Sequence, residues 1–126
     1  MNFPDTLSYT KDHEWIRVEG NVAVIGITDF AQGELGDVIY IDIPEGAEVS
    51  SGDSCGTVEA VKTVSDIYTP VSGKVTEVNA ALNDAPDTVN RDPYGAGWLL
   101  KITMSNPDDL KAHAMDVNAY KALIGK

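Results

Sequence analysis

The sequence has few positive charges. Nine Lys and Arg residues stand against 20 Asp and Glu residues, which gives a formal net charge of -11 and a pI near 4.3. Proteins that bind nucleic-acid phosphates or anionic lipids use clusters of Lys and Arg. We therefore expect neither nucleic acid nor a membrane among the partners, and a basic partner surface is favoured.

Cysteine and long apolar runs are also scarce. Cys55 is the single cysteine, so the chain cannot form an internal disulfide or a cysteine-based zinc cluster, which suits a reducing compartment. No stretch approaches the length of a membrane span, and the first residues resemble neither a secretory signal nor an Arg-rich transit peptide. These features predict a cytoplasmic protein, although a mature mitochondrial matrix chain would look similar.

The motifs of the common enzyme classes are missing. The sequence has no Gly-rich phosphate loop, no G-x-S-x-G elbow and no His pair at metal-ligand spacing. His13 and His113 are far apart, and both are predicted to lie at the surface. Cys55 has no positive charge nearby in the sequence that would stabilise a thiolate. We expect no metal site and no catalytic residue.

The first two-thirds of the chain has the pattern of short strands and turns. In residues 14–19, Ile16 and Val18 are predicted to face the core. Trp15 and Arg17 are then predicted to face solvent. Further strands are expected at 21–27, 38–43, 57–69, 74–78 and 98–103.

Three helices are expected from their capping signals. Thr28 can cap a short helix that ends at Gly36, and Asn106 and Pro107 can start a second. Asp116 can cap a third, whose apolar face comprises Val117, Tyr120, Leu123 and Ile124. No linker divides the chain. We expect one domain over 1–126, strand-rich over 10–104 and helical over 107–124.

Lys62 is the only basic residue between Arg17 and Lys74. A lysine in a β protein is usually a solvated surface residue. Nearby carboxylates keep an ammonium group charged, and a charged amine is not nucleophilic, which weighs against a Schiff-base enzyme. A lysine that another enzyme acylates must instead be exposed, fixed in position and free of competing lysines. Lys62 meets the last condition.

The segment around Lys62 closely resembles the lipoyl-lysine segment of the glycine cleavage system H proteins. Residues 59–62, Glu-Ala-Val-Lys, match the attachment motif of that family. The segment as a whole reads GTVEAVKTVSDIYTPVSGKVTEVN over 56–79. Four further matches occur in the same order as in the family: HEW at 13–15, GITDFAQGELGDV at 26–38, DPYGAGWLLKI at 92–102 and NPDDL at 106–110. The resemblance therefore covers nearly the whole chain.

The resemblance implies a mainly β fold. In this family the chain forms a flattened barrel-sandwich hybrid of the lipoyl/biotinyl type, with two antiparallel sheets, short peripheral helices and a C-terminal helical segment. Lys62 would lie at a hairpin tip. From the residues alone Val61 and Thr63 favour a strand, but a turn with negative φ throughout, such as type I, accepts them.

The resemblance also implies a function. The chain would be a non-catalytic carrier, with lipoate joined to Lys62 as an amide by a lipoyl ligase or a lipoyl/octanoyl transferase. The arm would take an aminomethyl group from a PLP-dependent glycine decarboxylase to a tetrahydrofolate-dependent aminomethyltransferase. Dihydrolipoamide dehydrogenase, with FAD and NAD, would then reoxidise it.

Two acidic residues, Glu14 and Asp66, match positions that the family places near the loaded arm. A carboxylate in that position would attract the cationic aminomethyl group. Solvated surface carboxylates are the alternative interpretation. A monomer is favoured, since no heptad seam or long apolar edge is present.

Other classes of protein stay open. A biotin carrier has Met on both sides of its lysine, where this chain has Val61 and Thr63. A lipoyl domain of a ketoacid dehydrogenase acyltransferase has Asp before its lysine and lies in a much longer chain. An enzyme with Lys62 as nucleophile would need a desolvated pocket around it. A structural interaction module would not need Lys62 at all.

Overall fold

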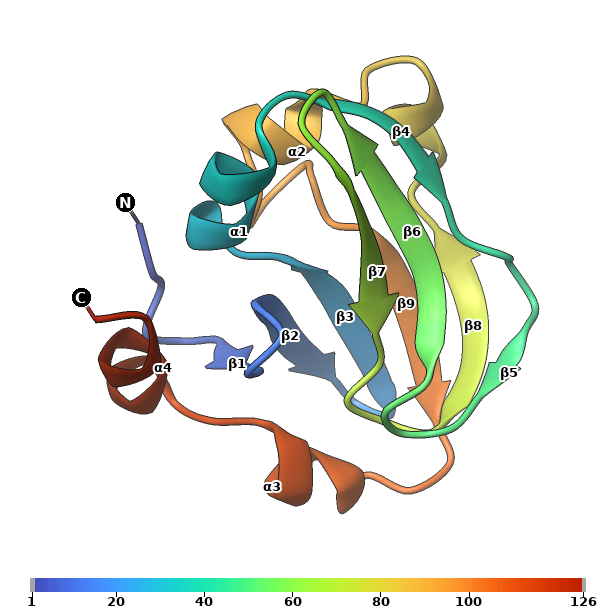
Figure 1. Ribbon diagram of the computed structural model, residues 1–126. Helices are drawn as coiled ribbons and strands as arrows, with labels where there is room; N and C mark the ends of the chain where they lie inside the picture. Colours follow the sequence, from blue (N-terminus) through green and yellow to red (C-terminus); the bar gives the residue numbers. More distant parts are fainter. Residues whose placement is uncertain (1, 126) are drawn as a thin grey trace.

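The computed structural model describes residues 2–125, so the two end residues of the predicted domain lie outside the described part. The chain forms two antiparallel sheets (Figure 1). The larger sheet has the order β1-β2-β3-β9-β8-β5, with strands Ser8–Tyr9, Glu14–Glu19, Val22–Ile27, Leu100–Met104, Gly73–Val78 and Glu48–Val49. The smaller sheet has the order β4-β6-β7, with strands Val38–Asp42, Ser54–Ala60 and Val64–Tyr68. The predicted mainly β, two-sheet fold is confirmed.

Short helices lie beside the sheets. They are α1 (Asp29–Leu35), the 3-10 turn η1 (Ala80–Asn83), α2 (Thr88–Arg91), α3 (Asp109–His113) and α4 (Val117–Ile124). The predicted caps of α1 and α4 are present, because the side chains of Thr28 and Asp116 accept the N–H groups of Ala31 and Ala119. Within residues 2–125, none of these helices has the length and apolar character needed to span a membrane.

The start of α3 differs from the prediction. The helix begins at Asp109, whereas the sequence pattern placed its first residue at Pro107. The Asn106 side chain does accept an N–H group, that of Asp108. Residues 107 and 108 form a turn instead of the first helical residues, so the helix begins two residues later.

The main apolar core fills the space between the two sheets. The larger sheet contributes Ile25 and Ile102, and the smaller sheet contributes Val58 and Ile67. All four side chains are buried, as expected where the inner faces of two sheets pack together.

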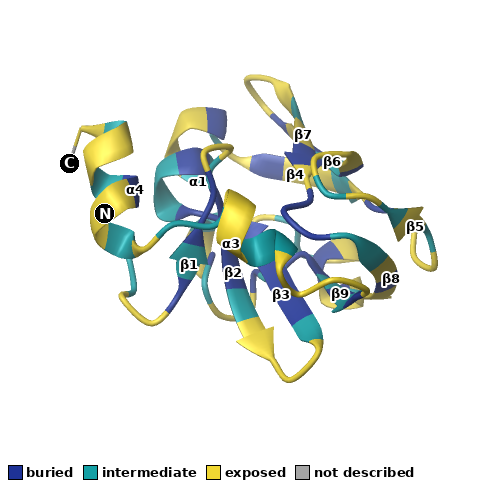
Figure 2. Ribbon diagram, turned by 90° about the horizontal axis from the view of Figure 1, so that it is seen from below, coloured by how far each residue is buried: buried dark blue, intermediate teal, exposed yellow. Residues whose placement is uncertain are grey.

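The prediction that Trp15 faces solvent is wrong. The alternation along β2 is correct, since Ile16 joins the main core while Trp15 joins a second apolar cluster. That cluster also contains Tyr120 of α4, and partly buried Tyr94 packs against it, so residues from distant segments cover the face of β2 that the pattern assigned to water. Figure 2 shows β2 buried at its start and exposed at its end. The Trp15 indole Nε1–H also donates to the Pro93 carbonyl at 2.9 Å.

Two other apolar side chains are more exposed than predicted. Val18 is 49% exposed, because it lies next to the exposed hairpin turn that joins β2 to β3. Leu123 is 52% exposed, although Tyr120 of the same helix is fully buried. On α4 only part of the expected apolar face therefore packs against the domain.

Substitution of two glycines by alanine tests this packing. A Cβ at Gly26 of β3 would lie 2.5 Å from Nε1 of Trp15, whereas a Cβ at Gly33 of α1 would meet no atom within 4 Å. We expect Gly26→Ala to lower the free energy of unfolding by about 1–3 kcal/mol through overpacking. Gly33→Ala is expected to raise it by about 0.5–1 kcal/mol, because Ala favours a helix over Gly.

Urea unfolding of both variants measures these changes. If Gly26→Ala unfolds at the wild-type urea concentration, the close packing of Trp15 on β3 is wrong.

Candidate functional site

Lys62 lies at the exposed tip of the hairpin that joins β6 to β7. The Ala60 N–H donates to the Thr63 carbonyl at 2.8 Å and closes a loop made of Val61 and Lys62. His13 is the only non-glycine residue with positive φ in residues 2–125, so both loop residues have negative φ. The β-branched Val61 accepts that conformation without strain. The continuous strand that the residue pattern predicted over 57–69 is therefore wrong, because this loop interrupts it, whereas the hairpin tip implied by the resemblance is present.

The loop also contacts the segment that follows α1. The Val61 N–H donates to the Asp37 carbonyl at 2.9 Å. The aliphatic part of Lys62 lies beside Gly36, where a Cβ would come within 3.4 Å of three of its carbons. No ion pair of Lys62 is found among the described residues. Lys62 is thus exposed, held by its backbone, and not engaged by a carboxylate.

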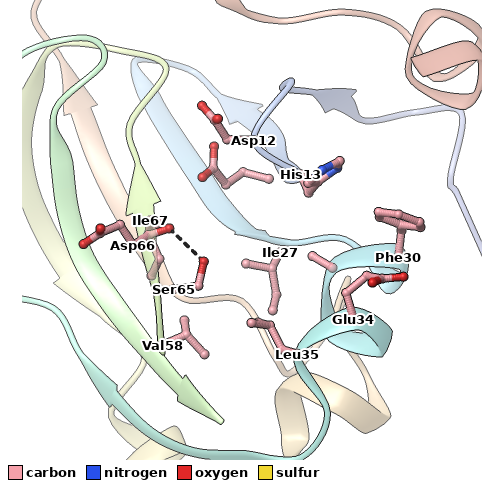
Figure 3. Close-up of a pocket in the computed structure, with 12 residues that line it drawn as sticks. Asp12, His13, Ile27, Phe30, Glu34, Leu35, Val58, Ser65, Asp66 and Ile67 are labelled. Atoms are coloured by element: carbon pink, nitrogen blue, oxygen red, sulfur yellow. Dashed lines mark hydrogen bonds between the residues drawn. The ribbon is translucent and has the colours of Figure 1, made fainter. Parts of the chain in front are cut away.

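A cavity of about 290 Å³ opens beside this hairpin, between α1 and β7 (Figure 3). One face of α1 lines it with Phe30, Ala31, Glu34 and Leu35. The opposite side comprises Val58 of β6 and residues 65–67 of β7. Since Gly36 directly follows α1, the stem of Lys62 rests at the end of the helix that forms this wall.

The sequence pattern did not reveal this cavity. The spacing of its α1 residues, i, i+1, i+4 and i+5, shows that they share one helical face. That spacing could have identified a common face. It could not have shown that this face borders a cavity, because apolar helix faces usually pack against a core.

Glu14 is buried at the cavity and is only 2% exposed. One of its carboxylate oxygens accepts from the Thr10 hydroxyl at 2.8 Å, and the other accepts from the Tyr68 N–H at 3.0 Å. Thr10 Oγ1 itself accepts the N–H groups of Asp12 and Glu14, which leaves the hydroxyl proton for the carboxylate. These donors are arranged to receive an ionised carboxylate.

Burial opposes that ionisation. The loss of water around the carboxylate raises the pKa of Glu14 to about 8, although the hydrogen bonds from Thr10 and Tyr68 act to lower the pKa. Glu14 therefore changes charge near neutral pH, and an additional positive charge in the cavity would favour its ionised form.

Asp66 is close to the cavity but its carboxylate points away from it (Figure 3). The carboxylate accepts from the hydroxyl groups of Ser54 and Tyr68 on the exposed face of the smaller sheet. Alternation along β7 explains this, since Ser65 and Ile67 face inward and Asp66 faces outward. The structure brings Glu14 into the cavity and leaves the Asp66 carboxylate outside it.

His13 is not the simple surface residue that the sequence predicted. It has a positive φ of 69° and lines the cavity. Its Nδ1 lies 3.0 Å from the hydroxyl of Tyr120, which ties this loop to α4. Burial lowers the pKa of His13, and Asp12 and Glu34 act in the opposite direction.

The other two candidates for reactive chemistry offer no site. In residues 2–125, no group of three or more His, Cys, Asp or Glu side chains could hold a metal ion, and His113 is exposed on α3. Cys55 is buried, and burial raises the pKa of its thiol to about 12. Such a thiol is not ionised near neutral pH.

The two-sheet fold, with an exposed lysine at a hairpin tip beside a cavity, is compatible with the class of carrier proteins. Comparison with known proteins then gives its family.

The family model described as glycine cleavage H-protein matches residues 7–126. A glycine cleavage system H protein from Bacteroides fragilis is 51% identical over 125 residues, which cover 98% of each chain. One from Symbiobacterium thermophilum is 53% identical over 122 residues, which cover 96% of this chain and 94% of the relative. The crystal structure of the H protein from Mycobacterium marinum matches with a TM-score of 0.89 at 40% identity, covering 98% of this chain and 100% of that one.

This chain belongs to the glycine cleavage H-protein family. The resemblance seen in the sequence is confirmed, and with it the role of a lipoyl carrier in the glycine cleavage system.

The raised pKa of Glu14 predicts a dependence of stability on pH. The folded state binds the proton of Glu14 more tightly than the unfolded state, whose pKa is near 4.5. The contribution of Glu14 to stability is therefore greatest at low pH and is lost as the pH rises from about 4.5 to about 8. Each pKa unit corresponds to about 1.4 kcal/mol, so the loss amounts to a few kcal/mol.

The matched variant is Glu14→Gln, which cannot ionise. We expect the difference in unfolding free energy between Glu14→Gln and the wild type to shift in favour of the variant as the pH rises from 5 to 8. Urea unfolding at several pH values measures it. A difference that stays constant over this range would show that Glu14 has an ordinary pKa.

Proposed function

We propose that Lys62 is the residue to which lipoate is attached and that the chain, as one domain over 1–126, is a carrier without turnover of its own. The observation that carries the proposal is the position of Lys62 at an exposed turn with a fixed backbone. Amide formation removes the charge of the lysine, and no ion pair among residues 2–125 would be broken by it. The surroundings of Lys62 are therefore compatible with an attached lipoyl group.

The family name supports the proposed partners. Lys62 would hold lipoate as an amide, and the lipoyl disulfide would supply the acceptor for an aminomethyl group. The proposed partners are a PLP-dependent glycine decarboxylase, a tetrahydrofolate-dependent aminomethyltransferase, and dihydrolipoamide dehydrogenase with FAD and NAD. A lipoyl ligase or lipoyl/octanoyl transferase attaches the lipoate. The bacterial relatives support a cytoplasmic location, and we propose that the chain acts as a monomer.

We propose that Glu14 holds the cationic end of the loaded arm. The cavity beside Glu14 has apolar walls formed by Ile27, Leu35 and Val58. Apolar walls exclude water and strengthen the attraction between a cation and a carboxylate. Glu14 keeps its proton at neutral pH in the empty cavity and releases it when a cation enters, because an opposite charge lowers its pKa.

A contact of Asp66 with the loaded arm is a weaker proposal. Asp66 follows Lys62 by four positions and lies on the exposed face of β7. A contact with the arm would form outside the cavity, where water and salt screen the charge. Its contribution is expected to be smaller than that of Glu14.

Attachment at Lys62 is tested directly by intact mass. Expression with lipoate is expected to give the wild-type chain one lipoyl group, located on Lys62 by peptide mapping. Lys62→Arg is expected to stay folded, because the side chain is exposed, and to receive no lipoyl group, because a guanidinium group stays protonated. Glycine decarboxylation with the partner enzymes should then be lost. Full activity of Lys62→Arg would refute the proposal.

Single substitutions separate the two carboxylates. We expect Glu14→Gln to shorten the lifetime of the aminomethyl-loaded form about tenfold or more, since a hydrogen bond to a charged group contributes about 1.5–3 kcal/mol. Asp66→Asn should change it by no more than about twofold, because an exposed charge contributes about 0–1 kcal/mol. The double variant is expected to have a shortened lifetime and normal lipoylation.

The measurement is the rate at which the loaded form loses ammonia and formaldehyde to water. An unchanged lifetime in Glu14→Gln would contradict the role of Glu14, and an Asp66→Asn effect as large as that of Glu14→Gln would contradict the distinction between them.

A further inference from the structure

The side chain of Asn90, on α2, joins two segments that are distant in the sequence. Its Oδ1 accepts the N–H of Val38 at 2.9 Å, and its Nδ2 donates to the carbonyl of Gly36 at 2.9 Å. A third bond runs from Nδ2 to Oε1 of Gln32 at 3.0 Å. Both the oxygen and the nitrogen of the Asn90 side-chain amide therefore form hydrogen bonds.

The orientation of this amide follows from its neighbours. The Gln32 Nε2 group donates to Oδ1 of Asp29 at 2.7 Å, so Oε1 of Gln32 is left to accept from Asn90. Nδ2 of Asn90 must then face Gln32 and Gly36, and Oδ1 must face the N–H of Val38. The donors and acceptors match throughout.

The two backbone groups that Asn90 binds lie on either side of Asp37. The carbonyl of Asp37 accepts the N–H of Val61, and Gly36 lies against the stem of Lys62. In Figure 1 the tip of the β6–β7 hairpin lies beside the segment between α1 and β4, with α2 next to both. Asn90 thus fixes the support on which the hairpin tip rests, and the bonds of its side chain do not include Lys62 itself.

We propose that Asn90 is a positioning residue for the acylation of Lys62. This inference rests on the proposed function, since it concerns the same lysine. The bond between Ala60 and Thr63 closes this exposed loop, and the bond from Val61 to Asp37 holds it from outside the hairpin. Each mobile group that must be ordered on binding weakens recognition by an enzyme. With the Asp37 carbonyl fixed, the loop has one position before the enzyme binds.

The chemical step itself is unchanged by Asn90. The neutral amine of Lys62 attacks the acyl carbon of an activated lipoyl group, such as an acyl-adenylate. The new C–N bond forms, the C–O bond between the acyl carbon and the phosphate breaks, AMP leaves with the electrons of that bond, and the amine loses a proton. Asn90 therefore affects how well the lysine is presented and not the rate of this step once the complex has formed.

The test uses the unmodified chain as substrate of a lipoate–protein ligase with lipoate and ATP. For Asn90→Ala we expect the KM for the chain to rise about fivefold to tenfold, which corresponds to about 1.0–1.4 kcal/mol of binding. The kcat should stay within about twofold of the wild type. A second readout is hydrogen exchange at the amide of Val61, which should become faster because its acceptor is no longer fixed.

A matched control is Asn79→Ala. The Asn79 side chain also holds a loop, by donating to the carbonyls of Ala96 and Trp98 at 2.8 Å, but none of these bonds involves residues 36–38 or 60–63. Its loss should lower stability and leave the KM for acylation and the Val61 exchange unchanged. If Asn90→Ala does not fold, Asn90→Asp keeps an acceptor for the Val38 N–H and should raise the KM about threefold.

The outcomes separate the inference from the proposed function. A wild-type chain that is not acylated on Lys62 would refute the proposed function. Two results would overturn the inference alone, provided that the wild type is acylated on Lys62. One is an unchanged KM for the Asn90 variant, and the other is an equal KM for the Asn90 and Asn79 variants.

Discussion

The contact between the β6–β7 hairpin tip and the segment after α1 is the interaction on which the site depends. A backbone hydrogen bond from Val61 to Asp37 joins the hairpin tip to the segment that follows the helix lining the cavity. Gly36 makes room at that place for the stem of Lys62. Because α1 and the hairpin meet there, the backbone of Lys62 has a fixed position relative to the wall of the cavity.

The carboxylates around the cavity differ in their exposure to water. Glu14 is the carboxylate buried at the cavity, whereas Asp12, Glu34 and Asp66 are exposed. The exposed carboxylates remain in contact with water, which screens their interactions. The buried one responds to what occupies the cavity, because its environment contains few dipoles other than the two donors that bind it.

Several features could be predicted from the sequence because they arise from local chemistry. The capping of α1 by Thr28 and of α4 by Asp116 depends on residues within one helical turn. The alternation along β2 correctly separated Ile16 from Trp15 onto two faces. Which of these faces meets water could not be predicted, because Trp15 is covered by residues far along the chain, such as Tyr94 and Tyr120.

By itself the sequence determined the isolation of Lys62 among acidic residues and, through an ordered set of motifs, the family to which the chain belongs. Only the tertiary structure decided that the Glu14 carboxylate enters the cavity and that the Asp66 carboxylate does not. It also decided that the Asn90 side chain binds the backbone on both sides of Asp37. These relations join residues tens of positions apart, and their distances depend on how the sheets and helices pack, which no local pattern of residues encodes.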